Sequence, residues 1–301
     1  MMVNKERQDF SFTGSDGLQI ACYRWPHAGR ATGILQMSHA FGSNALHFAR
    51  LATVMSDAGF EVYASDHRGC GRTAKDLRSL GDFGGIAGWK ATVADVVLLN
   101  KIAISENAGL PLIVLGQGIG SFIVQQFLLD HSELVAGAIL SGSAALDQLV
   151  AAFKSGELES LNAAFEPART PLDWLSRDNI AVDAFLNDPS CSFGFGETTL
   201  EALAHAAPRL SDPKELAGIR SKLPIYLLAG DQDPINRQLE WVKLLASRYR
   251  TAGVFDVTEQ YYPGGRHELL HETNWEEVQK DLLRWCRRVC DSPNRNRVEV
   301  S

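Results

Sequence analysis

Short apolar runs typical of buried strands alternate along the chain with segments of helical periodicity. The predicted strands, most of them buried on both faces, cover residues 33–37, 60–65, 111–116, 136–142, 224–230 and 255–262. The predicted helices cover residues 47–59, where Phe48, Leu51 and Met55 share one face, residues 88–104, the stretch after Gly120, and the apolar stripe from Trp275 to Val289.

This alternation predicts an α/β fold with a doubly wound, mostly parallel sheet. An amino-terminal hairpin, residues 9–13 with 18–25, is expected to add antiparallel edge strands. The alternation stops between residues 145 and 220, which contain helical segments and prolines but no central strand. We therefore interpret residues 1–144 and 221–301 as the core. Residues 145–220 are interpreted as a helical cap over the carboxyl edge of the sheet, where ligands bind in such folds.

Composition and charge exclude several classes of function. The net charge of -7 argues against a nucleic-acid partner, because phosphate binding needs a basic surface. The charged start of the sequence is unlike a signal peptide, and no apolar run approaches the ~20 residues that span a bilayer. The five cysteines have no CxxC spacing, which favours reduced thiols over a disulfide framework or a zinc knuckle. We expect a cytoplasmic protein without stable membrane insertion or a metal.

A glycine-rich corner between a predicted strand and helix carries the first candidate chemistry. Residues 114–124 read VLGQGIGSFIV, which partly fits the G-x-G-x-x-G loop of dinucleotide-binding folds. The next strand ends without the carboxylate that would bind a ribose, which disfavours that reading. The corner also fits the nucleophile elbow G-x-S-x-G through Gly116 and Gly120, with Gly118 where serine is expected. Glycine suits this strained turn, so the fold would be kept while an oxygen is lost.

Two further motifs supply an acid and a base. Asp233, in AGDQDPIN, follows an apolar strand and could orient a histidine, while Asp231 is expected to brace the loop. Residues 267–271 read HELLH, which also matches a zinc protease motif, but a convincing third ligand is missing downstream. Because the motif follows a strand and a Pro-Gly-Gly loop, we interpret His267 as the general base and His271 as structural. The order nucleophile, acid, base is that of α/β-hydrolases.

An oxyanion hole would complete this arrangement. Residues 36–44, QMSHAFGSN, follow an early strand and are similar to the H-G-x-G loop of lipases. The backbone N–H groups of Phe41 and Ile119 would then face the developing oxyanion, each stabilising the transition state by ~3 kcal/mol. His39 is expected to shape this loop and to transfer no proton.

With these motifs the chain resembles the bacterial monoacylglycerol lipase and lysophospholipase group of α/β-hydrolases, over nearly its whole length. The shared segments include VLGQGIGSFIVQQFLLDH, GDQDPIN, YPGGRHELLHE and the cap stretch FEPARTPLDWLSRD. The resemblance implies a small-molecule ester as substrate and no cofactor. It places Asp233 and His267 on the catalytic acid and base, Phe41 and Ile119 on the oxyanion donors, and Gly118 on the nucleophilic serine.

The sequence departs from that family at several positions. Gln117 stands where histidine is common, Ala40 where glycine is usual, and Ser43-Asn44 where Glu-His is frequent. Apolar residues of the cap suggest an apolar or aromatic part of the substrate. The candidates are Leu161, Phe165, Leu172, Trp174, Phe185 and Phe193.

The missing serine leaves two explanations open. The chain could be a natural pseudoenzyme that binds an apolar ester or another small ligand, or its serine could have been deliberately replaced. Asp233, His267 and the oxyanion loop all still fit an intact enzyme, so we favour a serine ester hydrolase in a silenced, essentially inactive form. Neither Ser121, a helical turn away, nor Cys70, on another loop, is expected to replace the nucleophile. A zinc metalloprotease and a dinucleotide-binding protein are the less favoured alternatives.

Overall fold

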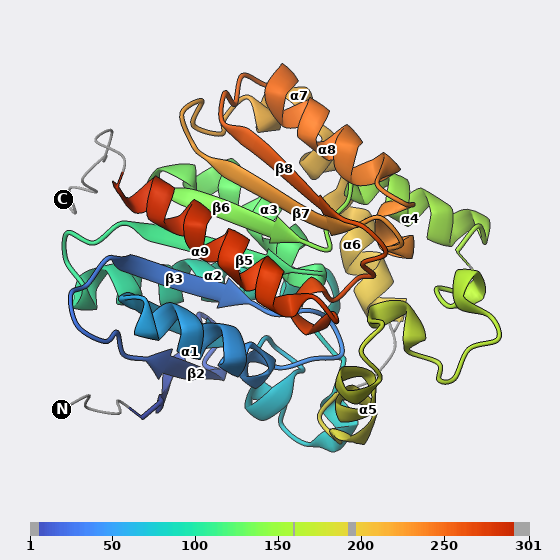
Figure 1. Ribbon diagram of the computed structural model, residues 1–301, viewed down its shortest axis with the longest axis horizontal. Coiled ribbons are helices and arrows are strands. Elements are labelled where there is room, and N and C mark those ends of the chain that lie inside the picture. The colour runs from blue at the N-terminus through green and yellow to red at the C-terminus, as the bar shows by residue number, and fades with distance from the viewer. Residues whose placement is uncertain (1–5, 159, 192–196, 292–301) are drawn as a thin grey trace.

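The computed structural model describes residues 6–158, 160–191 and 197–291, in which a twisted sheet lies between two layers of helices (Figure 1). The strands are β1 (Gln8–Thr13), β2 (Gln19–Trp25), β3 (Gly33–Ser38), β4 (Phe60–Ser65), β5 (Leu112–Gln117), β6 (Gly137–Ser141), β7 (Ile225–Gly230) and β8 (Val257–Tyr262). They form an eight-stranded sheet in the order β1-β2-β4-β3-β5-β6-β7-β8. Strands β1 and β2 pair antiparallel at one edge, and β3 to β8 run parallel. The predicted α/β fold class is confirmed, with strand boundaries shifted by one or two residues.

The helices are α1 (Ala49–Asp57), α2 (Gly85–Glu106), α3 (Ile119–His131), α4 (Leu146–Ser155), α5 (Asn179–Asn187), α6 (Glu197–Ser211), α7 (Pro213–Leu216), α8 (Glu240–Thr251) and α9 (Trp275–Asp291). Two buried apolar clusters fill the layers on either side of the sheet. One joins the sheet to α1 and α9, and the other joins it to α2, α3 and α8. Strands β3 to β7 are buried on both faces, which explains their nearly continuous apolar sequence.

Some predicted helices begin or end elsewhere. The segment predicted as a helix over 47–59 is a short 3-10 turn (Ala45–Phe48) followed by α1. Helix α3 begins at Ile119 instead of after Gly120, so the turn between β5 and α3 is a single residue, Gly118. This sharp turn leaves no loop between strand and helix.

Helices α4 to α7 lie between β6 and β7, and the described residues of this stretch contain no strand. Helix α6 packs against α2, α3 and α4, so part of the segment is tied to the helical layer of the sheet. Helix α5 lies apart from them, beside the carboxyl ends of the strands (Figure 1). The division into a core and a cap at residues 145–220 stays a prediction.

Two glycines allow α3 to approach the sheet much more closely than a side chain would permit. A Cβ atom on Gly116 would lie 2.6 Å from the Cα atom of Ser121. One on Gly120 would lie 2.7 Å from the carbonyl oxygen of His39, and closer still to that of Ser38. Both contacts are with backbone, which cannot move aside as a flexible side chain could. The sequence G-x-x-x-G at this corner is therefore a packing requirement.

This requirement predicts that Gly120→Ala destabilises the protein by about 3 kcal/mol, because the added methyl overlaps backbone at the end of β3. The matched control is Gly109→Ala. Gly109, unlike Gly120, has a positive φ of 84°, but a Cβ there meets nothing within 4 Å, so the cost comes from the backbone conformation alone and is expected to be about 1 kcal/mol. Urea unfolding of both variants measures the difference. Equal destabilisation would contradict the packing argument.

Candidate active site

Gly118 forms the turn between β5 and α3, at the carboxyl edge of the sheet. Its backbone has φ 54° and ψ −122°, a conformation that glycine adopts readily and that strains other residues. Its N–H donates to the carbonyl oxygen of Ser141 on the neighbouring β6, at 3.0 Å. The hydroxyl of Ser121 donates to the Gly118 carbonyl at 2.6 Å and lies 2.8 Å from the Ser143 hydroxyl, from which it can accept. Ser121 is therefore used in bracing the turn.

The Cα atom of Gly118 faces the imidazole of His267. A Cβ atom built on Gly118 would lie 3.1 Å from His267 Nε2 and 3.1 Å from Ala40 Cβ. A hydroxyl carried by that Cβ could therefore reach the imidazole nitrogen. The contact with Ala40 is tighter than most van der Waals contacts, so the methyl of Ala40 partly occupies the space beside position 118.

A buried hydrogen bond joins Asp233 to His267. Asp233 follows β7 and is fully buried, and His267 follows β8 and is 5% exposed. The Asp233 Oδ2 atom lies 3.0 Å from His267 Nδ1 and also accepts from the Asn236 amide at 3.2 Å. The other oxygen, Oδ1, accepts from the Ile235 N–H at 2.9 Å. Because Asp233 holds Nδ1, the free nitrogen, Nε2, points toward Gly118.

The charge of Asp233 sets the basicity of His267. Burial acts to lower the pKa of His267, but the Asp233 carboxylate, by its charge and hydrogen bond, and the nearby Glu268 hold this pKa above its ordinary value. A raised pKa makes the imidazole a better proton acceptor. The pair therefore has the geometry and the electrostatics of a general base with its orienting acid.

The segment between β6 and β7 contacts the histidine loop directly. The backbone N–H of Glu268 donates to the carbonyl oxygen of Leu175 at 2.7 Å. The ring of Trp174 lies 5.1 Å from that of His267 between centroids. Gly142, with φ 57°, leaves room for the imidazole, since a Cβ there would lie 2.9 Å from His267 Cε1. Close packing by Trp174 and Gly142 thus limits where the imidazole can lie.

The loop after β3 lies against the amino-terminal end of α3. His39 is fully buried, with Nδ1 2.8 Å from the Ala40 carbonyl and Nε2 accepting from the His67 N–H at 2.9 Å. Burial lowers the pKa of His39, so the ring is neutral and structural. Phe41 and Ile119 both line the space next to Gly118, and as the first residue of α3 Ile119 directs its N–H out of the helix end. Such an N–H is suited to an oxyanion.

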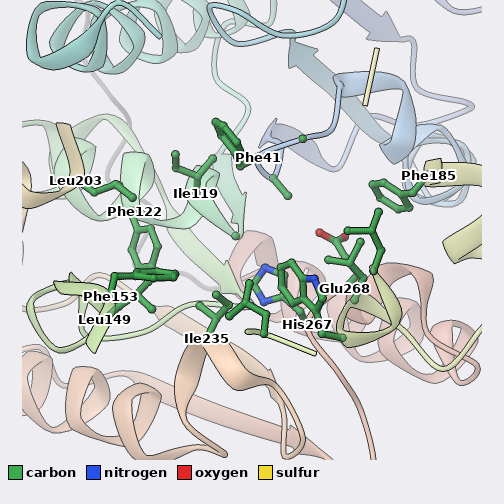
Figure 2. Close-up of a pocket in the computed structure, with 17 residues that line it drawn as sticks. Phe41, Ile119, Phe122, Leu149, Phe153, Phe185, Leu203, Ile235, His267 and Glu268 are labelled. Atoms are coloured by element: carbon green, nitrogen blue, oxygen red, sulfur yellow. The ribbon is translucent and has the colours of Figure 1, made fainter. Parts of the chain in front are cut away.

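A cavity of about 210 Å³ opens beside Gly118 and His267 (Figure 2). The residues that line it are almost all apolar, and Glu268 is the one among them with a carboxylate. The lining residues are Ala40, Phe41, Gly42, Gly118, Ile119, Phe122, Leu149, Phe153, Leu161, Leu172, Trp174, Leu175, Phe185, Leu203, Ile235, His267 and Glu268. A small apolar ligand placed there would lie against the histidine.

The structure places the predicted cap residues differently. Leu161, Leu172, Trp174 and Phe185 line the cavity. Phe165 does not, because its ring lies under the guanidinium of Arg266, 4.1 Å from its centre. Phe193 is outside the described residues.

Several residues that line the cavity were not predicted from the sequence. Phe122 on α3, Leu203 on α6 and Ile235 after Asp233 carry no motif and look like ordinary core residues. Leu149 and Phe153 are four residues apart on α4, and this spacing is the one sequence signal that could have found them. Glu268 follows the histidine directly, and its carboxylate is bound by the amide of Gln117 and lies 3.4 Å from His271 Nδ1. Gln117, a departure from the family pattern, thus supports the histidine loop.

The structure disfavours a zinc protease site at HELLH and a nucleophilic role for Cys70. Leu269–His271 form a 3-10 turn. His271 binds the His47 carbonyl, whereas His267, which precedes the turn, binds Asp233. HELLH therefore lacks the α-helix that would place both histidines on one metal. Cys70 is fully buried, and burial raises the pKa of its thiol well above the usual range, so it is a poor nucleophile.

Among the helices that the structure describes, there is none with the length and apolar character needed to span a bilayer.

Residues 29–274 match the family described as serine aminopeptidase, S33. The chain belongs to this family.

One curated relative and two solved structures are similar to this chain over most of its length. The chain is 29% identical to a monoacylglycerol lipase of Mycolicibacterium smegmatis over 295 residues, which cover 94% of this chain and 98% of the relative. A carboxyl esterase from Bacillus coagulans superposes with a TM-score of 0.83 at 25% identity, covering 94% of this chain and 99% of that one. A monoglyceride lipase variant from Saccharomyces cerevisiae superposes with a TM-score of 0.74 at 22% identity, covering 95% and 96% of the two chains.

The Asp233–His267 pair predicts that His267 titrates above its ordinary pKa of about 6.5. In Asp233→Asn the negative charge is lost while burial remains, so the pKa should fall below that of the unchanged protein. Asp231→Asn is the matched control, because Asp231 binds the Gly264 N–H and does not touch His267. NMR titration of the imidazole signals measures the pKa of His267 in the unchanged protein and in both variants. An unchanged pKa in Asp233→Asn would show that Asp233 does not set the basicity of His267.

Proposed function

We propose that this chain has the framework of a carboxylic ester hydrolase in which Gly118 occupies the position of the nucleophilic serine. The observation that carries the proposal is the 3.1 Å between a Cβ atom built on Gly118 and His267 Nε2. With serine at position 118 the hydroxyl, His267 and Asp233 would form a catalytic triad. With glycine there, the chain is expected to bind esters and to be essentially inactive.

In the serine form, the hydroxyl at position 118 would attack the ester carbonyl while His267 accepts its proton. Asp233 would hold the imidazole in the tautomer that leaves Nε2 free, and would stabilise the imidazolium. The N–H groups of Phe41 and Ile119 would stabilise the oxyanion. His267 would then protonate the leaving alcohol, and water activated by the same base would release the acid from the acyl-enzyme.

The proposed substrate is an ester with an apolar acyl or aromatic part. The apolar lining of the cavity supports this choice, as do relatives named monoacylglycerol lipase and carboxyl esterase. The family description names an aminopeptidase, whose substrate carries an α-ammonium group. The carboxylate in the cavity wall, Glu268, is already engaged by Gln117 and His271, so an ammonium would have to compete for it. We therefore favour esters over peptides.

A second candidate function is ligand binding without hydrolysis. The observation that favours it is Ala40, whose methyl lies 3.1 Å from a Cβ atom built on Gly118. The family resemblance leads us to expect glycine at position 40. A chain that lost its serine naturally could fill that space with such a methyl. The two candidates differ in whether the site still accepts serine.

We predict that Gly118→Ser raises kcat/KM on p-nitrophenyl esters and monoacylglycerols by roughly 10³-fold or more, because it supplies the nucleophile to an existing base. Gly118→Ala is the matched control. It adds the same Cβ atom without the hydroxyl and should stay inactive. Addition of Asp233→Asn to Gly118→Ser should remove most of the gain.

The double variant Gly118→Ser/Ala40→Gly separates the two candidates. If Gly118→Ser alone is fully active, Ala40 tolerates a serine and the silenced hydrolase is supported. If activity appears only in the double variant, the loop has adapted to glycine and natural loss of the nucleophile is supported. Two folded but inactive variants would contradict the hydrolase proposal.

A further inference from the structure

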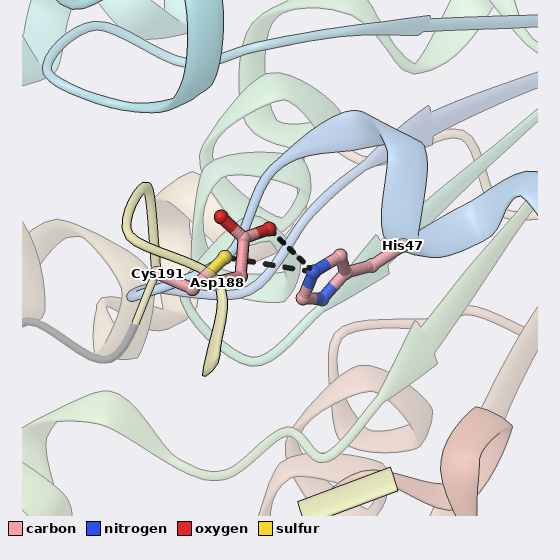
Figure 3. A group of neighbouring side chains, drawn as sticks. All are labelled: His47, Asp188 and Cys191. Carbon is pink, nitrogen blue, oxygen red and sulfur yellow. Dashed lines mark hydrogen bonds and ion pairs between the residues drawn. The ribbon is translucent and has the colours of Figure 1, made fainter. Parts of the chain in front are cut away.

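A second cluster of reactive side chains lies outside the candidate active site, between the core and the segment that follows α5. It consists of His47, Asp188 and Cys191, whose nitrogen, oxygen and sulfur atoms all lie within 4.8 Å of one another (Figure 3). His47 belongs to the 3-10 turn before α1, whereas Asp188 and Cys191 follow α5. In the part of the chain that the structure describes, no other three histidine, cysteine or acidic side chains come this close together.

The spacing of these atoms matches a tetrahedral metal site. The Nε2 atom of His47 lies 3.5 Å from Asp188 Oδ2 and 3.5 Å from Cys191 Sγ. Tetrahedral zinc with bonds of about 2.0–2.3 Å holds nitrogen and oxygen ligands about 3.4 Å apart, and nitrogen and sulfur ligands about 3.6 Å apart. The three side chains could therefore share one cation with little movement.

Neighbouring groups orient each ligand atom. The other ring nitrogen of His47, Nδ1, lies 3.2 Å from the Ser43 hydroxyl, which directs Nε2 into the cluster. The oxygen of Asp188 that faces away, Oδ1, accepts from the N–H and hydroxyl of Ser190 at 2.8 and 2.7 Å. The Asn44 amide donates to Asp188 Oδ2 at 3.3 Å and lies 3.5 Å from Cys191 Sγ. Outer partners of this kind are typical of metal ligands.

We propose that His47, Asp188 and Cys191 form a binding site for a zinc-class divalent cation. Imidazole, thiolate and carboxylate are all ligands that zinc accepts, and a water would complete the tetrahedron. Cys191 is buried, but the Asp188 side chain is 30% exposed, which gives the cation a route from solvent. On binding, the Cys191 thiol gives up its proton to solvent and its sulfur bonds to the metal.

The site would join two parts of the chain. Phe185, which lines the candidate active-site cavity, lies on α5 with its ring 4.3 Å from that of His47 between centroids. A cation held by His47 on one side and Asp188 and Cys191 on the other would fix α5 against the core. This inference does not depend on whether the protein hydrolyses esters.

The test is a titration of the metal-free, reduced full chain with Co²⁺, followed by displacement with Zn²⁺. We expect one equivalent of Co²⁺ to produce a thiolate-to-cobalt charge-transfer band and the visible spectrum of a tetrahedral site. Cys191→Ser should abolish the charge-transfer band. Since loss of an outer partner costs roughly 10–100-fold in affinity, Asp188→Asn, which removes a ligand, should weaken binding ~100-fold or more. His131→Gln, at a half-exposed histidine elsewhere, should change nothing.

Two independent readouts accompany the spectra. Zinc at one hundred times its dissociation constant should raise the Tm by about 3–5 °C. It should also slow amide hydrogen exchange in α5, in the unchanged chain and not in Cys191→Ser. Circular dichroism of the metal-free variants checks that each is folded. If Cys191→Ser does not fold, Asp188→Asn is the variant that tests the site. A cobalt spectrum without a sulfur band, or equal zinc affinity in the unchanged chain and both ligand variants, would overturn the proposal.

Discussion

The close contact between the start of α3 and the ends of β3 and β5 determines the geometry of the rest of the site. Without side chains at Gly116 and Gly120, the helix reaches the strand backbone directly, and the turn shrinks to one residue. That contact holds the loop after β3 beside the helix amino terminus, so Ala40 and Phe41 face Gly118 and Ile119. An oxyanion site made of backbone groups needs such rigid placement, because its donors act only if they are oriented before the charge forms.

A buried charge then acts on this framework. Asp233 is removed from water, so its hydrogen bonds to Ile235, Asn236 and His267 are the means by which its negative charge is stabilised. The same bonds orient the imidazole toward Gly118 and raise its pKa. Acid, base and elbow come from the ends of β7, β8 and β5, which a parallel sheet brings to one edge. Under the proposed function, the serine hydroxyl is the one part of this arrangement that the sequence lacks.

The segment between β6 and β7 contributes in two ways. Its apolar side chains close the cavity over His267, and its backbone binds the histidine loop through Leu175. Near α5 it meets the core again at His47, where imidazole, carboxylate and thiol gather. A cation bound at His47, Asp188 and Cys191 would help to position Phe185 at the cavity. Gly118, Asp233 and His267 do not indicate that such a cation site exists.

Strand periodicity and motif order are local properties of the chain, so they were enough to predict the sheet, most of its helices and the candidate residues Gly118, Asp233 and His267. The sequence by itself did not separate Phe165, which packs on Arg266, from Leu172, which lines the cavity, since both are apolar residues of one irregular stretch. The tertiary structure alone decided that Ala40 crowds position 118, that Gln117 supports Glu268, and that His47 meets Asp188 and Cys191. These contacts join residues up to 151 positions apart in the sequence. Whether such residues meet in space depends on how the layers pack and not on any pattern along the chain.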